Sequence, residues 1–406
     1  MEEVSIALVS MGGYEYNYYG TRLLHPPHEQ KIRLVGGVSR SPENVNEEYK
    51  QSGIPVYSSL DELYENTQVD LTISSGPIHM HAQVTCTALS NNSNVLCEKP
   101  LTATIQEAQK MAEEEKKSER FVAVGYQWSF SDPIQALKRD IIEGLFGDPI
   151  SLKTLVLWPR PLSYYNRNDW AGRKKVGQQW VLDSPVQNAA AHYLHNMFYI
   201  LGDSREKSAQ PLEIEAELYR ANNIENYDAA ALRCVTEGDT EILFYSAHCV
   251  PENKGRILCY EFEKAVVEFN DMGSNCFTVR FDNGHTKNYG NPEEDLDKKL
   301  WDSVRSVRTK EAVACGIQAS IPHTLCVNGA QESVKIQTFP EEMVKQSSND
   351  DTVLVWVEGL SKALHDSYQR GILPSESDEH SWAHKGHKIN LSNYHFFPSS
   401  EHSIIK

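Results

Sequence analysis

The stretch that decides the fold is VDLTISSGPIHMHAQVTCTALSNNSNVLCEKPL, at positions 69–101. It opens with the apolar run VDLTIS, which predicts a β-strand, and a second such run, VLC, occupies positions 95–97. Residues 79–89, between the two runs, have helical character. A strand, a helix and another strand in this order predict a parallel βαβ unit.

The same alternation continues on both sides of this stretch. Apolar runs predict further strands at residues 4–9, 32–39 and 121–125, and residues 102–115 predict a helix. Thr104 and Glu107 have the spacing of a capping box at the start of that helix. The alternation predicts a parallel sheet with helices on both faces, in which ligands bind beyond the carboxyl ends of the strands.

The pattern changes at about residue 212. From there most apolar runs are strand-like, which predicts a largely antiparallel sheet in a second domain. Helices are expected at residues 295–307, 322–333 and 353–371, and a polar loop at residues 340–351. The chain has 406 residues, enough for two such domains.

Composition excludes several classes of partner. The formal net charge of −17 argues against nucleic acid or an anionic membrane, although it leaves room for a local basic pocket. No apolar run reaches the roughly 18 residues of a membrane span, and the N-terminus does not resemble a signal peptide. Eight cysteines without a C-x-x-C pair indicate a reduced, cytoplasmic protein.

The motif Cys97-Glu98-Lys99-Pro100 stands at the end of a predicted strand. Lys99 is therefore expected in the crevice beyond the sheet, and the proline after it favours an extended backbone. A lysine desolvated in a cleft has a lowered pKa and can act as an acid, a base or a polarising donor. The alternative is a solvated surface lysine before a helix.

Together with residues 69–101, the stretches FVAVGYQWSF (121–130) and IIEGLFGDPISLKTLVLW (141–158) resemble the Gfo/Idh/MocA family of glucose–fructose oxidoreductase and inositol dehydrogenase. The resemblance is dense to about residue 201 and weaker beyond. It implies an α/β fold: a Rossmann domain with a doubly wound parallel sheet at residues 1–126, followed by an α+β domain at residues 127–406. The second domain would carry a large, mostly antiparallel open sheet, the substrate face and an interface for a homo-oligomer.

The family's second signature, D-x-G-x-H-x-x-D, resembles NAAAHYLH at positions 188–195. Asn188 replaces the first acid and His195 the last, and on one helix Asn188, His192 and His195 would share a stripe. By the resemblance, Lys99, His192 and Asn188 are the catalytic residues. His192 would exchange the proton of a substrate hydroxyl, and Asn188, which cannot act as a base, would hold an oxygen. Buried, hydrogen-bonded histidines are the alternative.

The segment WPRPLSYYNRNDWAGRKKVGQQW, at positions 158–180, mixes aromatic rings with arginines. Such a mixture suits a polyhydroxylated or acidic ligand, although a packed aromatic loop is an open alternative. Asp183 follows it and can supply the carboxylate that Asn188 lacks, or simply cap a helix. The residues predicted to contact substrate are Tyr126, Trp128, Arg167, Trp170, Arg173, Asp183 and His195.

The loop after the first strand, LVSMGGYEYNYYG at positions 8–20, departs from the dinucleotide fingerprint G-x-G-x-x-G. Ser10 stands at the first glycine and Glu15 at the third, while Gly12 and Gly13 remain. No acid stands at Ser39, and Ser39 with Arg40 suits a 2′-phosphate, so the cofactor is NAD or NADP with a lean to NADP. The residues predicted to contact it are Ser10, Gly12, Gly13, Ser39, Arg40, Ser75, Pro77, His81, Glu98 and Lys99.

The resulting hypothesis is an NAD(P)-dependent oxidoreductase that moves hydride between nicotinamide and a secondary alcohol of a sugar, inositol or related polyol. One alternative is an NAD-dependent glycoside hydrolase that uses transient oxidation. Another is a non-catalytic binding relative, which the departures at Ser10, Glu15 and Asn188 favour. The histidines at 380, 384 and 387 lack the spacing of a known metal site, so no metal is expected.

Overall fold

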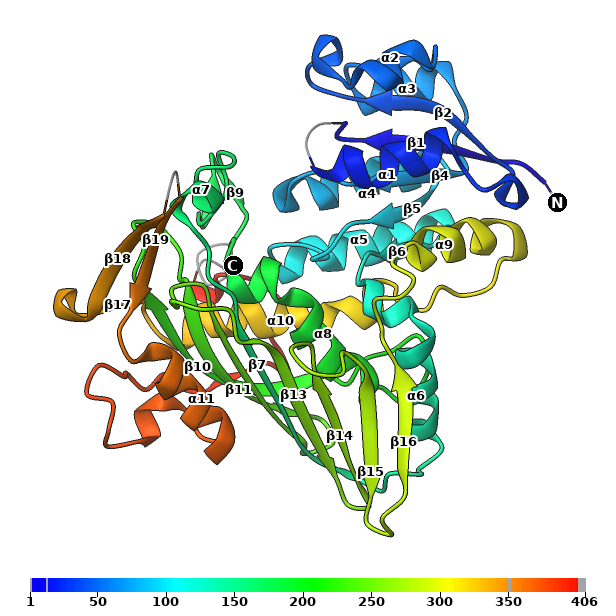
Figure 1. Cartoon of the computed structure of the whole chain (residues 1–406). Helices are drawn as coiled ribbons and strands as arrows, with labels where there is room; N and C mark the ends of the chain where they lie inside the picture. The colour runs from blue at the N-terminus through cyan, green and yellow to red at the C-terminus, as the bar shows by residue number, and fades with distance from the viewer. Residues whose placement is uncertain (1, 12–13, 350–351, 401–406) are drawn as a thin grey trace.

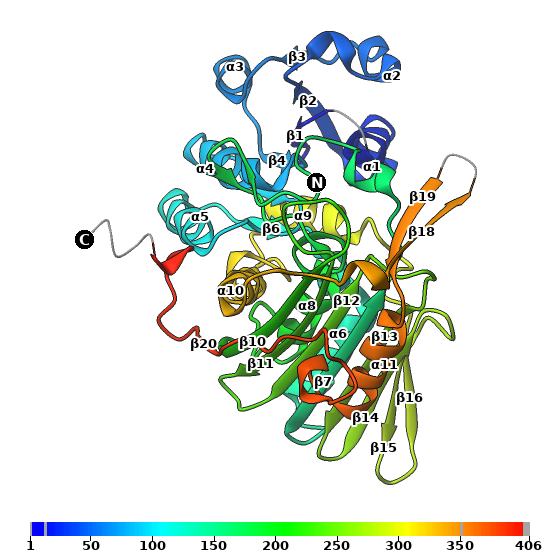
Figure 2. The same ribbon diagram turned by 90° about the vertical axis from the view of Figure 1, so that its left-hand side faces the viewer.

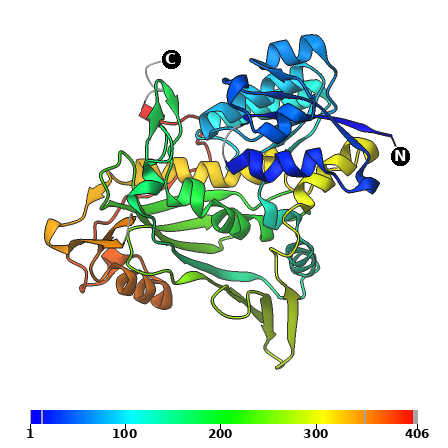
Figure 3. The ribbon, with the colours of Figure 1, turned by 45° about the horizontal axis from the view of Figure 1, so that its top comes forward.

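The computed structural model describes residues 2–11, 14–349 and 352–400, with residues 14–17 and 349 described by backbone only. Two sheets organise these residues (Figure 1). The first lies at the N-terminal end and the second holds most of the remaining strands. The helix α10 (Ile317–Ser333) runs between the two sheets, as Figures 1 and 3 both show in gold.

The first sheet has six parallel strands in the order β3-β2-β1-β4-β5-β6, as predicted. Its strands are β1 (Val4–Val9), β2 (Ile32–Val38), β3 (Val56–Tyr57), β4 (Leu71–Ser74), β5 (Asn94–Cys97) and β6 (Val122–Val124). The helices are α1 (Tyr14–Leu24), α2 (Glu47–Gln51), α3 (Leu60–Asn66), α4 (His81–Ser90) and α5 (Ile105–Ser118). The chain builds outward from β1 to β3 and then returns to place β4 on the other side of β1. This reversal is the switch point at which such sheets bind ligands.

The second sheet has ten strands on its main path or beside it, mostly antiparallel, as expected for an α+β domain. Its order is β16-β15-β14-β13-β7-β12-β11-β10-β17, and β20 pairs with β10. The strands are β7 (Pro149–Leu157), β10 (Pro211–Arg220), β11 (Ala229–Thr236), β12 (Glu241–Ala247), β13 (Gly255–Phe262), β14 (Ala265–Asn270), β15 (Phe277–Phe281), β16 (Thr286–Gly290), β17 (Gln337–Thr338) and β20 (Ile389–Asn390). The other elements are α6 (Asp132–Ile142), α7 (Leu162–Tyr165), β8 (Lys175–Val176), β9 (Gln179–Trp180), α8 (Ala191–Ile200) and α9 (Lys298–Thr309).

Different helices cover the two faces of the second sheet. The face toward the first sheet packs on α8 and α10, and the opposite face packs on α11 (Leu360–Arg370), as Figure 2 shows. Under α11, Leu360, Leu364 and Tyr368 join a buried cluster with Leu243 and Tyr245 of the sheet. Part of the outer face is therefore closed by the chain itself.

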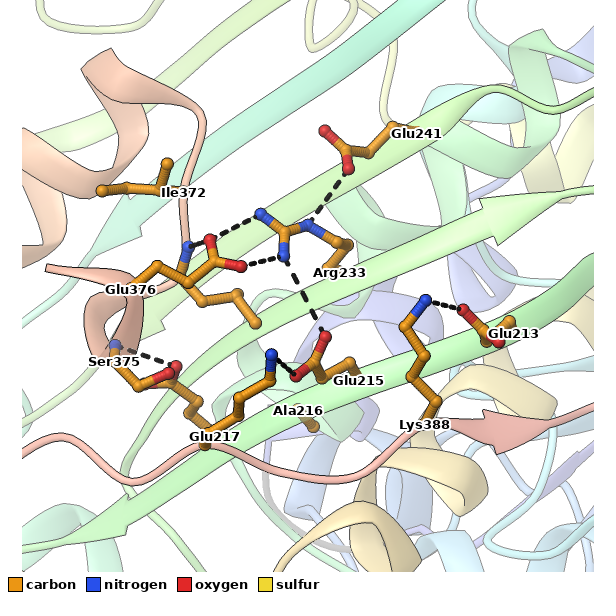
Figure 4. A network of polar contacts seen from close by, with 12 residues as sticks. Glu213, Glu215, Ala216, Glu217, Arg233, Glu241, Ile372, Ser375, Glu376 and Lys388 are labelled. Carbon is orange, nitrogen blue, oxygen red and sulfur yellow. Dashed lines mark hydrogen bonds and ion pairs between the residues drawn. The ribbon is translucent and has the colours of Figure 1, made fainter.

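The segment after α11 is fastened to the same face by Arg233 of β11 (Figure 4). Its guanidinium forms two hydrogen bonds to Glu376, of 2.5 and 2.7 Å, and an ion pair to Glu241 at 3.0 Å. Beside it, Glu217 accepts a 3.0 Å bond from the Ser375 amide. These charges hold the segment after α11 against the sheet.

Two local expectations for the C-terminal part are wrong. Residues 340–351 contain β18 (Val344–Asn349) instead of a loop, and the predicted helix at residues 353–371 begins only at Leu360. The run TVLVWV forms β19 (Thr352–Val357), which pairs with β18. Its β-branched residues favour a strand, and Gly359, at a φ of +79°, separates it from α11. The boundary after residue 126 stays a prediction.

Within the described ranges, we find no helix that combines the length and the apolar character needed to cross a bilayer. The capping box at the start of α5 is present as predicted, with the Thr104 amide donating to Glu107 Oε2 at 3.0 Å.

Candidate active site

Lys99 lies at the carboxyl end of β5, facing the chain segment that precedes α8. Its Nζ donates to Asn188 Oδ1 at 2.8 Å and to the Asn188 carbonyl oxygen at 3.0 Å. Burial lowers the pKa of Lys99 below its ordinary value, and the nearby Lys299 acts in the same direction. The structure thus brings together Lys99 and Asn188, which are 89 residues apart in the sequence.

A buried carboxylate stands directly behind Asn188. The amide nitrogen of Asn188 donates to Asp183 Oδ1 at 2.8 Å, and Asp183 Oδ2 accepts from the Gly172 amide at 2.7 Å. Arg167 approaches the same carboxylate at 3.8 Å. Burial raises the pKa of Asp183, and Arg167 opposes this. N–H groups can only donate, so both carboxylate oxygens of Asp183 act as acceptors. The side-chain amide of Asn188 therefore links Asp183 to Lys99.

The helix expected around residues 188–195 is not continuous. Residues Pro185–Ala189 form a single π-helical turn, and the regular helix α8 begins at Ala191. Ser184 opens the turn by accepting a 3.1 Å bond from the Gln187 amide. The predicted common stripe of Asn188, His192 and His195 is therefore wrong. The wide turn directs both oxygens of Asn188 to Lys99, as such turns often do at functional sites.

His192 lies in the first turn of α8 and is half-buried. Burial and the charge of Lys99 hold its pKa well below the ordinary range, so its imidazole is neutral at neutral pH. Nδ1 is buried and has no hydrogen-bond partner among the described residues. The ring meets Tyr126 edge-on, with centroids 5.9 Å apart.

His195 and Trp128 lie away from this cluster, in the core. His195 stacks on Tyr126 at 3.8 Å, and its Nε2 lies 3.0 Å from the hydroxyl of Ser129. Trp128 packs edge-on against Phe269 and is 1% exposed. Both side chains are held by packing in the core, although His195 Nδ1 has no hydrogen-bond partner among the described residues, and Tyr126 lies between His195 and His192.

The aromatic and basic segment forms a rim next to Asp183. The guanidinium of Arg167 lies 3.8 Å from the ring centroid of Tyr164 and 5.0 Å from that of Trp170. Arg173 is exposed, and its carbonyl oxygen accepts a 2.9 Å bond from the Asp183 amide. The rim therefore presents one stacked guanidinium beside the carboxylate.

The turn after β1 has the tight shape that a glycine at position 10 would allow, although Ser10 stands there. Ser10 adopts the left-handed conformation, with a φ of +70°, which costs a non-glycine residue some free energy. A Cβ atom added to Gly76 would lie 2.5 Å from Ser10 Oγ, so the ends of β1 and β4 approach closely. Ser75 donates to the Val9 carbonyl at 2.8 Å. Gly12 and Gly13 lie outside the described residues, as does the side chain of Glu15.

The other residues predicted to contact the cofactor lie near the switch point of the first sheet. Ser39 follows β2, with its amide bonded to the Tyr57 carbonyl at 3.0 Å, and Arg40 is exposed. Pro77 precedes a short 3₁₀ turn, Ile78–Met80, that leads into α4.

His81 is buried and bridges two loops at the same edge. Its Nδ1 lies 2.8 Å from the Pro100 carbonyl oxygen, and its Nε2 lies 2.9 Å from the Gly76 carbonyl oxygen. Carbonyl oxygens only accept, so this geometry suits an imidazolium that donates twice. Burial acts against the charge, but Cys97 and the two carbonyl groups outweigh it and raise the pKa of His81 to about 9.

The first part of the chain matches a known protein family. The family model for the oxidoreductase family with an NAD-binding Rossmann fold, GFO_IDH_MocA, matches residues 4–126. These residues belong to the Gfo/Idh/MocA family.

Among curated relatives, inositol 2-dehydrogenase of Salmonella typhimurium is 32% identical over 95 residues, which are 23% of this chain and 28% of that protein. The 2,7-anhydro-N-acetylneuraminate hydratase of Escherichia coli is 24% identical over 193 residues, which are 47% of this chain and 48% of the enzyme. The matches thus span less than half of these relatives.

A solved structure extends the likeness of the fold beyond residue 126. The WlbA dehydrogenase from Bordetella pertussis, solved with NADH and UDP-GlcNAcA, has a TM-score of 0.67. It is 19% identical, and the alignment covers 82% of this chain and 98% of that one. The arrangement of a Rossmann sheet followed by a second, mostly antiparallel sheet is therefore shared.

Two residues that were not predicted from the sequence, Tyr19 and Lys299, hold the E-K-P motif in place. Glu98 accepts a 2.5 Å hydrogen bond from the Tyr19 hydroxyl and forms a close ion pair with Lys299 of α9. Burial acts against ionisation of Glu98, but Lys299 outweighs it and lowers its pKa. Glu98 Oε2 also accepts from the Lys99 amide at 3.1 Å. No local pattern points to Lys299, which lies 201 residues away.

Proposed function

We propose that the protein is an NAD(P)-dependent oxidoreductase that transfers hydride between nicotinamide and a secondary alcohol of a sugar, inositol or related polyol. The observation that carries this proposal is the hydrogen-bonded array of Lys99, Asn188 and Asp183 at the carboxyl edge of the Rossmann sheet. Such an array places a polarising cation where cofactor and substrate would meet.

The cofactor edge fits a dinucleotide. The left-handed Ser10 and the close approach to Gly76 reproduce the tight turn of the fingerprint. Nicotinamide, when bound, supplies the acceptor or donor of hydride. The residues that would hold the cofactor are Ser10, Gly12, Gly13, Ser39, Arg40, Ser75 and Pro77, with His81 and Glu98 fixing the loops that bear them. An exposed Arg40 and the lack of an acid at Ser39 favour NADP over NAD.

In this mechanism both Lys99 and His192 act on the substrate hydroxyl, Lys99 as a hydrogen-bond donor and His192 as the proton acceptor. Asn188 accepts two of the three N–H bonds of the Lys99 ammonium, which leaves one to donate to the substrate oxygen. The neutral imidazole of His192 takes the hydroxyl proton as hydride leaves the carbon, and returns it in the reverse direction. Arg167, Trp170 and Arg173 would contact the other hydroxyl or acidic groups of the substrate.

The proposal is tested by adding NAD⁺ and NADP⁺ to the full chain with a panel of sugars and polyols. We expect Lys99→Met to lower kcat/KM for the best substrate by about 100-fold or more, because it removes the donor to the reacting oxygen. Lys116→Met, at an exposed position on α5, is the matched control and should retain full activity. Full turnover by Lys99→Met would show the assignment to be wrong.

A second candidate function is a reaction without net redox change, for which the cofactor would be oxidised and reduced within one turnover. The similarity to a hydratase favours it, because addition or removal of water leaves the oxidation level of substrate and product equal. The NAD-dependent glycoside hydrolase predicted as an alternative has the same property. Consumption of substrate with no net change in nicotinamide absorbance would select this candidate.

We also propose that the protein works in the cytoplasm as a homo-oligomer, with residues 1–126 as one domain and residues 127–406 as the other. The eight unpaired cysteines support a reducing compartment. The end of the family match at residue 126 supports the boundary.

A further inference from the structure

A pocket of about 720 Å³ lies at the far end of α10. Its lining includes none of Lys99, Asn188 and Asp183. Four segments of the chain build it, and each contributes a cation: Lys174, Arg220, Lys335 and Lys385. The protein as a whole carries a formal charge of −17, so a group of four cations around one pocket contrasts with the acidic character of the chain.

Three of these cations lack a carboxylate partner. The described residues form no ion pair with Lys174, Arg220 or Lys335, whereas Lys385 lies 3.5 Å from Glu215. The guanidinium of Arg220 donates only to neutral oxygens, the nearest being the Ile224 carbonyl at 2.8 Å. Burial and the charge of Arg220 lower the pKa of Lys174, and the charge of Glu225 opposes this. Two like charges are thus held close together, with Glu225 as a partial counter-charge.

Two carboxylates also line the pocket. Glu225 accepts a 3.1 Å bond from the Lys174 amide, and Glu332 accepts bonds of 2.5 and 2.9 Å from the amide and hydroxyl of Ser399. These donors are neutral, so both carboxylates keep their charge, and the carboxyl end of α10 adds about half a negative charge. The four cations of the lining still outnumber these negative groups, so the lining keeps an excess of positive charge.

The wall formed by the C-terminal segment is held rigidly. A Cβ atom added to Gly386 would lie 2.2 Å from the Ala216 carbonyl oxygen, so the segment runs directly against β10. The His387 amide donates to the Ser333 carbonyl at 2.9 Å, and the Ser333 hydroxyl donates to the His387 carbonyl at 2.7 Å. Lys385 and His387 are therefore positioned before any ligand arrives.

We propose that this pocket binds the phosphate group of a small phosphorylated metabolite. A planar guanidinium and several ammonium groups around one pocket suit a compact dianion. The volume exceeds that of a phosphate alone and leaves space for a small organic group. The site is separate from the proposed dehydrogenase chemistry, so its test is independent of that function.

The test is calorimetric titration of the full chain with inorganic phosphate, glucose 6-phosphate and glucose at low salt. We expect saturable, salt-sensitive binding of phosphate and of glucose 6-phosphate at one site per chain, and none of glucose. Lys174→Met and Lys335→Met should each weaken it at least tenfold. Lys362→Met, at an exposed position on α11, should bind as the unaltered chain does.

Lys335 is exposed, so its replacement leaves the fold intact and keeps the test valid if Lys174→Met is unstable. Absence of saturable binding of both phosphate compounds would overturn the proposal. Binding that is unchanged in both Lys174→Met and Lys335→Met would also overturn it.

Discussion

At the scale of single residues, the candidate site includes a carboxylate that acts on Lys99 without touching it. Asp183 orients the amide of Asn188, and Asn188 in turn holds Lys99. Asp183→Asn should therefore lower kcat about tenfold or more while changing KM little, because one accepting oxygen replaces the two that serve Asn188 and the Gly172 amide, and the negative charge is lost. The measurement is steady-state kinetics across pH, in which the loss of the nearby carboxylate should move the profile to lower pH. An unaltered pH profile with an unaltered kcat would contradict this role.

A second prediction at this scale concerns His81 and pH. Its pKa is raised in the folded state from 6.5 to about 9, so folding is favoured by its protonation. This contribution is fully present below pH 6.5 and is lost as the pH rises through about 9. The free energy of unfolding in urea should fall by a few kcal/mol, at about 1.4 kcal/mol per pH unit, across that window.

The matched pair for this measurement is His81→Gln and His28→Gln, of which His28 is exposed. The first should flatten the pH dependence across the window, and the second should leave it unchanged. An unchanged pH dependence in His81→Gln would contradict the prediction.

At the scale of elements, Glu98 ties together α1, β5 and α9 through Tyr19 and Lys299. Lys299→Met would leave a buried carboxylate without its cation and should cost about 3 kcal/mol of unfolding free energy. The neighbouring Lys298→Met is the control: its partner, Asp132, is largely exposed, so the cost should stay below about 1 kcal/mol. Equal losses in urea denaturation of the two variants would contradict the role given to Glu98.

The elements also show what a sequence can and cannot predict here. Alternating apolar runs predicted the parallel sheet, because strand and helix periods are local properties. The π-helical turn at Pro185–Ala189 was not predictable, since it depends on how Asn188 meets Lys99 from a distant strand. The same holds for Lys299, whose partner is 201 residues away. The β-branched residues of β19 are a local signal for a strand. The helix predicted at residues 353–371 nevertheless included them, because the pattern after Gly359 is helical.

At the scale of the whole molecule, α11 and the segment fastened by Arg233 cover only part of the outer face of the second sheet. They lie over β7, β11 and β12, and Ile257 of β13 packs against the cluster under α11. The outer face of β14 and β15 stays open and carries the half-buried Val266. If the chain forms a homo-oligomer through this sheet, the contact must use these uncovered strands.

We therefore expect light scattering after size exclusion to give a mass above that of one chain, and Val266→Arg to reduce it to that of one chain. An arginine at this position would add a long charged side chain to the middle of such a contact while leaving the inward-facing Val267 and the core unchanged. Lys362→Met, on the face of α11 that points to solvent, should leave the mass unchanged. A single-chain mass for the unaltered protein at all concentrations would show that the open strands serve no such contact, and an oligomer that survives Val266→Arg would place the contact on another surface.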